Sequence, residues 1–168
     1  MNKRSIIVGA ILGLVLSLFI GGIAFKIAAP TMFFKEVSSP YDFNKTAMLI
    51  SDRINKQDGW HVTTVINQRQ EILSHGGEDP GQVKIIKFCN GKLSGEMLKE
   101  DKTKSMAVKM PLSIAVYEKS DGRVTIGLMN GYLMARLFSG SREGEIMEHV
   151  VRDMESILGF IHFRYTIF

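Results

Sequence analysis

The chain has 168 residues, of which 45% are apolar and 23% are charged, and its formal net charge is +4. This composition excludes a disordered chain, and the length allows one folded domain with an additional segment. A basic excess can indicate binding to nucleic acid or to an anionic surface, so its position along the chain matters.

The first feature of the chain is an uncharged stretch from Ser5 to Phe25. Its 21 residues would form a helix about 30 Å long, which matches the hydrocarbon core of a bilayer. The stretch is also longer than the apolar part of a typical cleaved signal peptide. We therefore expect a retained transmembrane anchor within residues 1–29, and we expect Pro30 to end the helix.

Cleavage of this segment is the alternative to a retained anchor, because Gly22 and Ala24 are small residues at suitable offsets for a signal peptidase. For a retained anchor, Lys3 and Arg4 outweigh the lone Lys26, so the positive-inside rule places the short amino-terminal end in the cytoplasm. The expected localisation is a single pass through the cytoplasmic (inner) membrane with the rest of the chain in the periplasm.

The glycine spacing in the anchor and the distribution of charge along the chain both bear on binding partners. Gly9 and Gly13 form a small-xxx-small pair that could contact another membrane helix, from another membrane-protein subunit or from a second copy in a homodimer. Three of the 21 basic residues flank the apolar stretch, which leaves 18 against 17 acidic residues in the rest of the chain. The remainder is nearly neutral, so we expect no nucleic-acid binding.

The segment after the anchor predicts alternating strands and helices. Apolar residues recur at helical spacing within 43–54 and 146–158, and they alternate with polar residues within 60–66. The predicted elements, in chain order, are a strand over 32–37, a helix capped at Ser39-Pro40 that ends near Gly59, a strand over 60–66, a short helix over 68–75, a strand over 82–89, a short helix over 93–100, a hairpin of strands 112–117 and 124–129, a helical turn over 132–138, and a helix over 142–158 with Ser141 as its N-cap. This order predicts an α+β domain over residues 30–160, with a mixed or mostly antiparallel sheet of about five strands and helices packed on one face.

Four local motifs occur in a fixed order within this domain. They are Gly59-Trp60-His61-Val62, then Lys84-Ile85-Ile86-Lys87-Phe88-Cys89-Asn90, then Met110-Pro111-Leu112-Ser113-Ile114-Ala115-Val116-Tyr117-Glu118, and finally Asp121-Gly122-Arg123-Val124. Together they resemble domain-of-unknown-function family 302. The resemblance implies a compact α+β domain that often dimerises, is sometimes tethered to a membrane, and has no established activity.

The last segment, residues 161–168, is aromatic and alternates in polarity. Ile161, Phe163, Tyr165 and Ile167 are apolar, with polar residues between them. The alternation predicts an extra strand. It would pair with the sheet edge of its own domain, or it would lie on a partner subunit or at the bilayer interface.

Cys89 is the only cysteine, and it lies at the end of a predicted buried strand. As a thiolate it could carry a persulfide or a thioester, which makes it a weak candidate for a catalytic residue. A buried cysteine can equally act as a small apolar side chain. The weak candidates for binding are Cys89, Asn90, Met106, Met110 and His61.

The chain contains ten methionines, a high count. Thioethers outside the cytoplasm can bind cuprous copper, and Cys89 could add a thiolate. However, Met147 and Met154 belong to the apolar stripe of the last helix, and no Met-x-x-Met cluster occurs. The sequence therefore predicts no metal site and no cofactor.

These observations favour a membrane-anchored, extracytoplasmic binding or accessory module of unknown ligand. Such a module could be a subunit docked on a larger membrane complex. A sulfur carrier or thiol enzyme that depends on Cys89 is the alternative. An enzyme is the less favoured of the two because the sequence shows no catalytic constellation.

Overall fold

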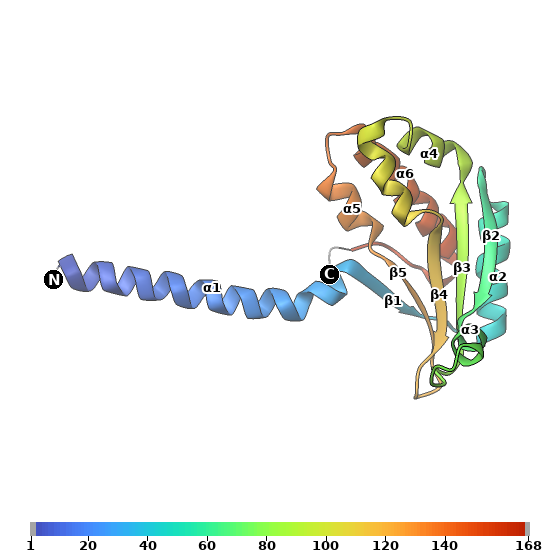
Figure 1. Ribbon diagram of the computed structural model, residues 1–168, viewed down its shortest axis with the longest axis horizontal. Coiled ribbons are helices and arrows are strands. Elements are labelled where there is room, and N and C mark those ends of the chain that lie inside the picture. The colour runs from blue at the N-terminus through green and yellow to red at the C-terminus, as the bar shows by residue number, and fades with distance from the viewer. Residues whose placement is uncertain (1–2, 167–168) are drawn as a thin grey trace.

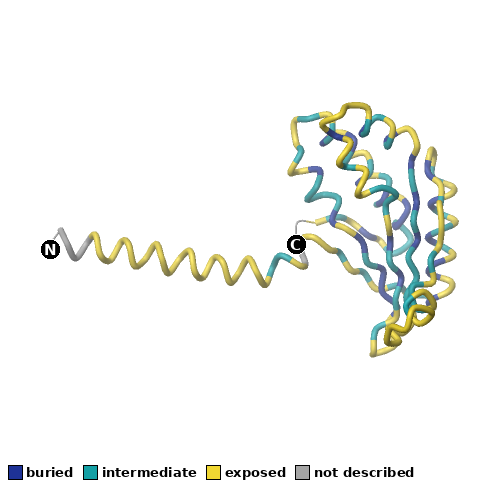
Figure 2. Tube along the Cα trace, in the orientation of Figure 1, coloured by how far each residue is buried: buried dark blue, intermediate teal, exposed yellow. Residues whose placement is uncertain are grey.

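A computed structural model describes residues 3–166 and shows a long helix projecting from one end of a two-layer domain (Figure 1). This helix, α1 (Lys3–Phe33), contains a segment, Ile7–Pro30, that is long and apolar enough to cross a membrane. Nearly all of α1 is exposed (Figure 2).

The expectation that Pro30 ends this helix is wrong, because α1 continues through Pro30 to Phe33. A proline removes only one backbone N–H from the helical hydrogen-bond pattern. The last turn of α1 is held from outside, since the backbone N–H of Asn130 donates to the Phe33 carbonyl at 2.8 Å and its Nδ2 donates to the Met32 carbonyl at 2.8 Å. Contacts with the domain therefore stabilise the helix where the proline weakens it.

The domain is built on a sheet of five strands in the order β1-β5-β4-β3-β2, in which every neighbouring pair is antiparallel. The strands are β1 (Phe34–Ser38), β2 (Trp60–Asn67), β3 (Val83–Asn90), β4 (Leu112–Glu118) and β5 (Val124–Met129). This sheet confirms the predicted α+β fold.

The helices of the domain are α2 (Phe43–Lys56), α3 (Gln68–Ser74), α4 (Gly91–Met97), α5 (Gly131–Leu137) and α6 (Arg142–Ile157), with 3-10 helices η1 (Asp101–Lys109) and η2 (Leu158–Ile161). The long helices α2 and α6 cover one face of the sheet (Figure 1). The sequence did not predict η1, which has only one buried residue, Thr103, and therefore lacks a regular apolar stripe.

Two helix starts were predicted from capping residues. Ser141 caps α6 as expected, accepting a hydrogen bond from the Gly144 N–H at 3.2 Å. For α2 the predicted cap at Ser39 is wrong, because Asp42 accepts from the Lys45 N–H at 2.9 Å. The Ser39 hydroxyl instead lies 2.6 Å from the hydroxyl of the buried Thr46.

The core lies between the sheet and the two long helices. The apolar stripe of α2 supplies Ile50 and Ile54, both fully buried. Arg53, on the same helix, joins α2 to α6, because its guanidinium donates to the carbonyls of Ile157 at 2.5 Å and of Ser156 at 2.9 Å. A cation at this position satisfies the last carbonyls of α6 and opposes the negative end of its dipole.

Asparagine side chains close three of the turns from a strand into a helix. Asn67, Asn90 and Asn130 each accept a hydrogen bond from the backbone N–H three residues later and so cap α3, α4 and α5. Because β3 and β5 both run antiparallel to β4, their carboxyl ends lie at the same end of the sheet. The caps therefore place α4 and α5 together at that end of the sheet.

The described part of the carboxyl-terminal tail, residues 162–166, forms no strand, so the predicted extra strand is absent there, and Ile167 lies outside the described residues. His162 has a φ of 54° and turns the chain after η2. Phe163 and Tyr165 then stack edge to face with ring centroids 4.8 Å apart and pack against the core. The Tyr165 N–H donates to a Glu155 carboxylate oxygen at 2.8 Å, so a side chain holds the tail instead of a strand edge.

The edge strand β1 follows α1 directly. Side chains on the exposed face of the sheet hold β1 to the rest of the domain. The Tyr117 hydroxyl, on β4, donates to the Glu36 carboxylate, and Lys119 Nζ lies 2.5 Å from it. The Tyr117 ring crosses Gly127 of β5, where a Cβ would lie 3.1 Å from Cε1 of the ring. The hydrogen bond from Lys119, followed by that from Tyr117, lowers the pKa of Glu36.

We predict that replacement Glu36→Gln reduces the loss of stability in acid. Because the pKa of Glu36 in the folded protein lies below its ordinary value of 4.5, the carboxylate contributes stability above that value and loses it as the pH falls through the folded pKa. Urea unfolding of the detergent-solubilised chain, followed by fluorescence of the single buried Trp60, measures this stability between about pH 6 and pH 3.

The expected result is a smaller decrease in unfolding free energy for Glu36→Gln than for the wild type as the pH falls. The control is Glu78→Gln, which alters an exposed carboxylate on the loop before β3. If wild type and Glu36→Gln show parallel pH profiles, the ion pair does not stabilise the attachment of β1.

Candidate functional site

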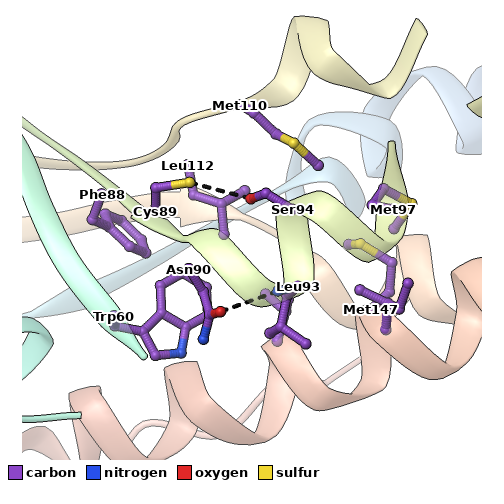
Figure 3. Close-up of a pocket in the computed structure, with 12 residues that line it drawn as sticks. Trp60, Phe88, Cys89, Asn90, Leu93, Ser94, Met97, Met110, Leu112 and Met147 are labelled. Atoms are coloured by element: carbon purple, nitrogen blue, oxygen red, sulfur yellow. Dashed lines mark hydrogen bonds between the residues drawn. The ribbon is translucent and has the colours of Figure 1, made fainter. Parts of the chain in front are cut away.

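The predicted site residues lie mainly around two cavities at the end of the sheet where α4 and α5 begin. The smaller cavity, of about 40 Å³, is lined by Cys89, Asn90 and Met110, among others (Figure 3). Cys89 Sγ lies 3.2 Å from the hydroxyl of Ser94. A space of this size holds only a few water molecules.

Among the described residues, the hydrogen-bonding neighbour of the Cys89 thiol is the Ser94 hydroxyl. A serine hydroxyl is neither a base nor a cation, which are the side-chain groups that favour a reactive thiolate. Within residues 3–166, no group of three or more His, Cys, Asp or Glu side chains is placed to hold a metal ion. Cys89 therefore serves as part of the cavity wall.

Two other predicted binding residues have different places. Asn90 is buried, and its Oδ1 accepts a hydrogen bond from the Leu93 N–H at 3.1 Å, so it caps α4. His61 faces Cys89 in the β2–β3 register but is exposed and lines neither cavity. The structure brings Cys89, Asn90 and Met110 together and leaves His61 apart.

The larger cavity has a volume of about 300 Å³, and methionine is the most frequent residue in its wall. Seven of the ten methionines contribute to it, namely Met97, Met106, Met110, Met129, Met134, Met147 and Met154. They come from α4, η1 and the residue after it, β5, α5 and α6. Methionine is flexible and polarisable, so such a wall can adapt to apolar molecules of different shape.

Sequence reasoning found only part of this cavity. Met106 and Met110 were predicted to bind a ligand, and both line it. Met147 and Met154 were assigned to the core stripe of the last helix, and they serve both roles. The remaining three, Met97, Met129 and Met134, were missed because they lie on separate elements that come together only in the folded domain. The high methionine count was the one available signal.

The cavity wall includes two lysines and one tyrosine. Lys87 and Lys109 line it near the start of β4, and neither ammonium group has a hydrogen-bond or ion-pair partner among the described residues. Tyr165 lines it beside α5 and α6, where burial, and then the nearby Glu155 carboxylate, raise the pKa of its hydroxyl well above the usual value. The tyrosine is therefore neutral, and Lys87 and Lys109 carry the positive charge of the wall.

The other end of the cavity is joined to the long helix. Met129 pairs with Phe34, the first residue after α1, in the register of β5 and β1. Asn130 follows and is buried, and its side-chain amide donates to the carbonyls of Met32 at 2.8 Å and Thr166 at 3.2 Å while its oxygen caps α5 at Leu133. One side chain thus connects α1, the tail and the helix that forms a wall of the cavity.

The fold and these motifs agree with comparisons to known proteins. The family model described as domain of unknown function DUF302 matches residues 35–161, so the chain belongs to this family. A solved structure with a similar fold is that of an uncharacterized conserved DUF302 protein from Bacillus stearothermophilus. It has 18% sequence identity and a TM-score of 0.66, and the match covers 78% of this chain and 99% of that one. No curated protein matches the chain.

We predict that Asn130→Ala loosens both segments that this side chain connects. The substitution leaves buried hydrogen-bonding groups unpaired, which costs about 1–3 kcal/mol in unfolding free energy. Hydrogen exchange of the full chain in detergent should show faster exchange at the backbone amides of α5 and at the end of α1.

Asn67→Ala is the matched control, because it removes a similar cap from the exposed helix α3. Its effect on hydrogen exchange should be confined to α3. Unchanged exchange in α5 and α1 of the Asn130→Ala variant would contradict the role assigned to Asn130.

Proposed function

We propose that this protein is a membrane-anchored binding module that holds a small apolar ligand in its methionine-lined cavity. The observation that carries the proposal is the convergence of seven methionine side chains on a cavity of about 300 Å³. This volume is at the lower end of the range for ligand sites, and an apolar wall with few polar groups is typical of them.

The anchor is supported by the character and position of α1. The apolar segment Ile7–Pro30 is not buried against the domain, so its side chains are free to contact lipid. Gly9 and Gly13 are likewise open, and a Cβ at either would contact nothing within 4 Å, which leaves this face available to a helix of another subunit or of a second copy. The charges around the segment favour a cytoplasmic amino terminus and a periplasmic domain.

The junction between α1 and the domain supports a position close to the bilayer surface. Only residues 31–33 separate the apolar segment from β1, a rise of about 5 Å in a helix. Phe33 and Phe34 are exposed here, as is Met129 opposite Phe34. A nearby bilayer surface would remove these exposed apolar side chains from water.

A role for Cys89 in sulfur chemistry receives less support. Its thiol is in contact with the Ser94 hydroxyl, next to a cavity that holds only a few water molecules. Docking on a larger membrane complex is consistent with the open glycine face of α1. We therefore infer a binding or accessory role over a catalytic one.

The binding function can be tested with xenon, which enters apolar cavities. The full chain, labelled with ¹³C at the methionine methyl groups and placed in lipid nanodiscs, should show xenon-dependent shifts for the seven cavity methionines. Met32 and Met48, which do not line the cavity, provide internal references. Cys89→Ser should leave the shifts unchanged, and an absence of shifts at the seven positions would contradict the proposal.

The proposed topology predicts that external protease degrades the domain in intact spheroplasts and that the chain stays in the membrane after a carbonate wash. The intact mass should include residues 1–29. Reversing the charge bias with Lys3→Glu and Arg4→Glu should place part of the population in the opposite orientation, protected from protease. A soluble chain that has lost its first 24 residues would show instead that the segment is a cleaved signal peptide.

A further inference from the structure

We propose that the ligand of the methionine-lined cavity is a single-chain amphiphile with an anionic end, of the class of a long-chain fatty acid anion, received from the bilayer. This inference rests on the proposed function and names the substrate class of the same cavity. Three features of the cavity support it: its apolar wall, its charged end, and its position relative to the anchor.

The wall selects for an apolar chain. Besides the methionines, the lining residues include Leu112, Ile114 and Leu128 from neighbouring strands of the sheet. The lining residues include no aspartate or glutamate. The hydroxyl of Tyr165 is neutral because its pKa is raised, so no negative charge in the wall opposes an anion. A hydrocarbon chain gains free energy by leaving water for such a surface.

The charged end selects for an anion. Lys87 lies opposite Ser113 in the β3–β4 register, and Lys109 precedes β4, so the two lysines line the same end of the cavity. Lys87 and Lys109 have no carboxylate partner within the described residues, as is also true of exposed lysines such as Lys92 and Lys99. What distinguishes Lys87 and Lys109 is that they line the cavity, where a bound carboxylate would supply a partner.

The position of the cavity favours a molecule from the membrane. The end formed by Met129, Gly131 and Met134 adjoins the junction with α1, while Lys87 lies on β3, on the side of β4 away from β1, and Lys109 lies just before the start of β4. An amphiphile that leaves a bilayer does so with its polar end foremost. Its carboxylate would therefore reach the lysines while its chain trails toward the membrane side.

The test uses the full chain with ¹³C-labelled methionine methyl groups, in nanodiscs of phosphatidylcholine, which has no net charge. Laurate and dodecanol, which share a twelve-carbon chain, are titrated separately at alkaline pH so that laurate is ionised. Laurate should shift the resonances of the seven cavity methionines and leave that of Met48, on α2, unchanged. Dodecanol should bind at the same methionines about tenfold more weakly, because it lacks the charge that the lysines recognise.

The double variant Lys87→Gln and Lys109→Gln should lower the affinity for laurate about tenfold, to the level of dodecanol, and leave dodecanol binding unchanged. Its control, Lys92→Gln with Lys99→Gln, alters exposed lysines that do not line the cavity and should change neither affinity. Xenon-dependent shifts of the seven cavity methionines in the double variant would show that its cavity is still formed.

The possible results separate this inference from the proposed function. If xenon shifts the seven methionines but laurate does not, the amphiphile inference is overturned and the apolar binding module stands. Equal affinity for laurate and dodecanol, or a laurate affinity that the double variant retains, overturns the role of the lysines. If neither xenon nor laurate shifts the seven methionines, both proposals fail.

Discussion

The buried amide of Asn130 joins three parts of the chain that are distant in sequence. Through its two donors and one acceptor it contacts the end of α1, the carboxyl-terminal tail and the first turn of α5. A buried amide that lost one of these partners would retain an uncompensated polar group, so the three segments are positioned together. One end of the cavity is consequently built at the point where the long apolar helix α1 passes into the sheet.

The cavity combines the properties of a core and of a binding surface. Met97 and Met154 are almost fully buried and belong to the core cluster, whereas Met129 is exposed at the end of β5. Branched aliphatic side chains in these positions would specify one packing, because their rotamers are few. Unbranched thioethers leave the same volume adjustable, which suits a site that is filled at some times and empty at others.

Sequence patterns predicted the regular elements of this fold because the signals were local. The strand over 124–129 has its observed bounds, and Ser141 caps α6 as its position before a helical stripe required. The errors at Pro30 and in the tail have a different origin. In both places the chain is held by distant side chains, Asn130 for α1 and Glu155 for Tyr165, and no local pattern reveals such contacts. Three of the cavity methionines, Met97, Met129 and Met134, were missed for the same reason, since they come together only after the sheet has formed.

The direct passage from α1 into β1 has a consequence for a chain that is anchored in a membrane by α1, as proposed above. Strand β1 begins at the residue after the helix ends, and no flexible linker separates them. A transmembrane helix tilts to match its apolar length to the thickness of the surrounding bilayer. If α1 spans a bilayer as proposed, such a tilt would be transmitted to the sheet, and the thickness of the membrane would set the angle at which the domain lies over the lipid surface.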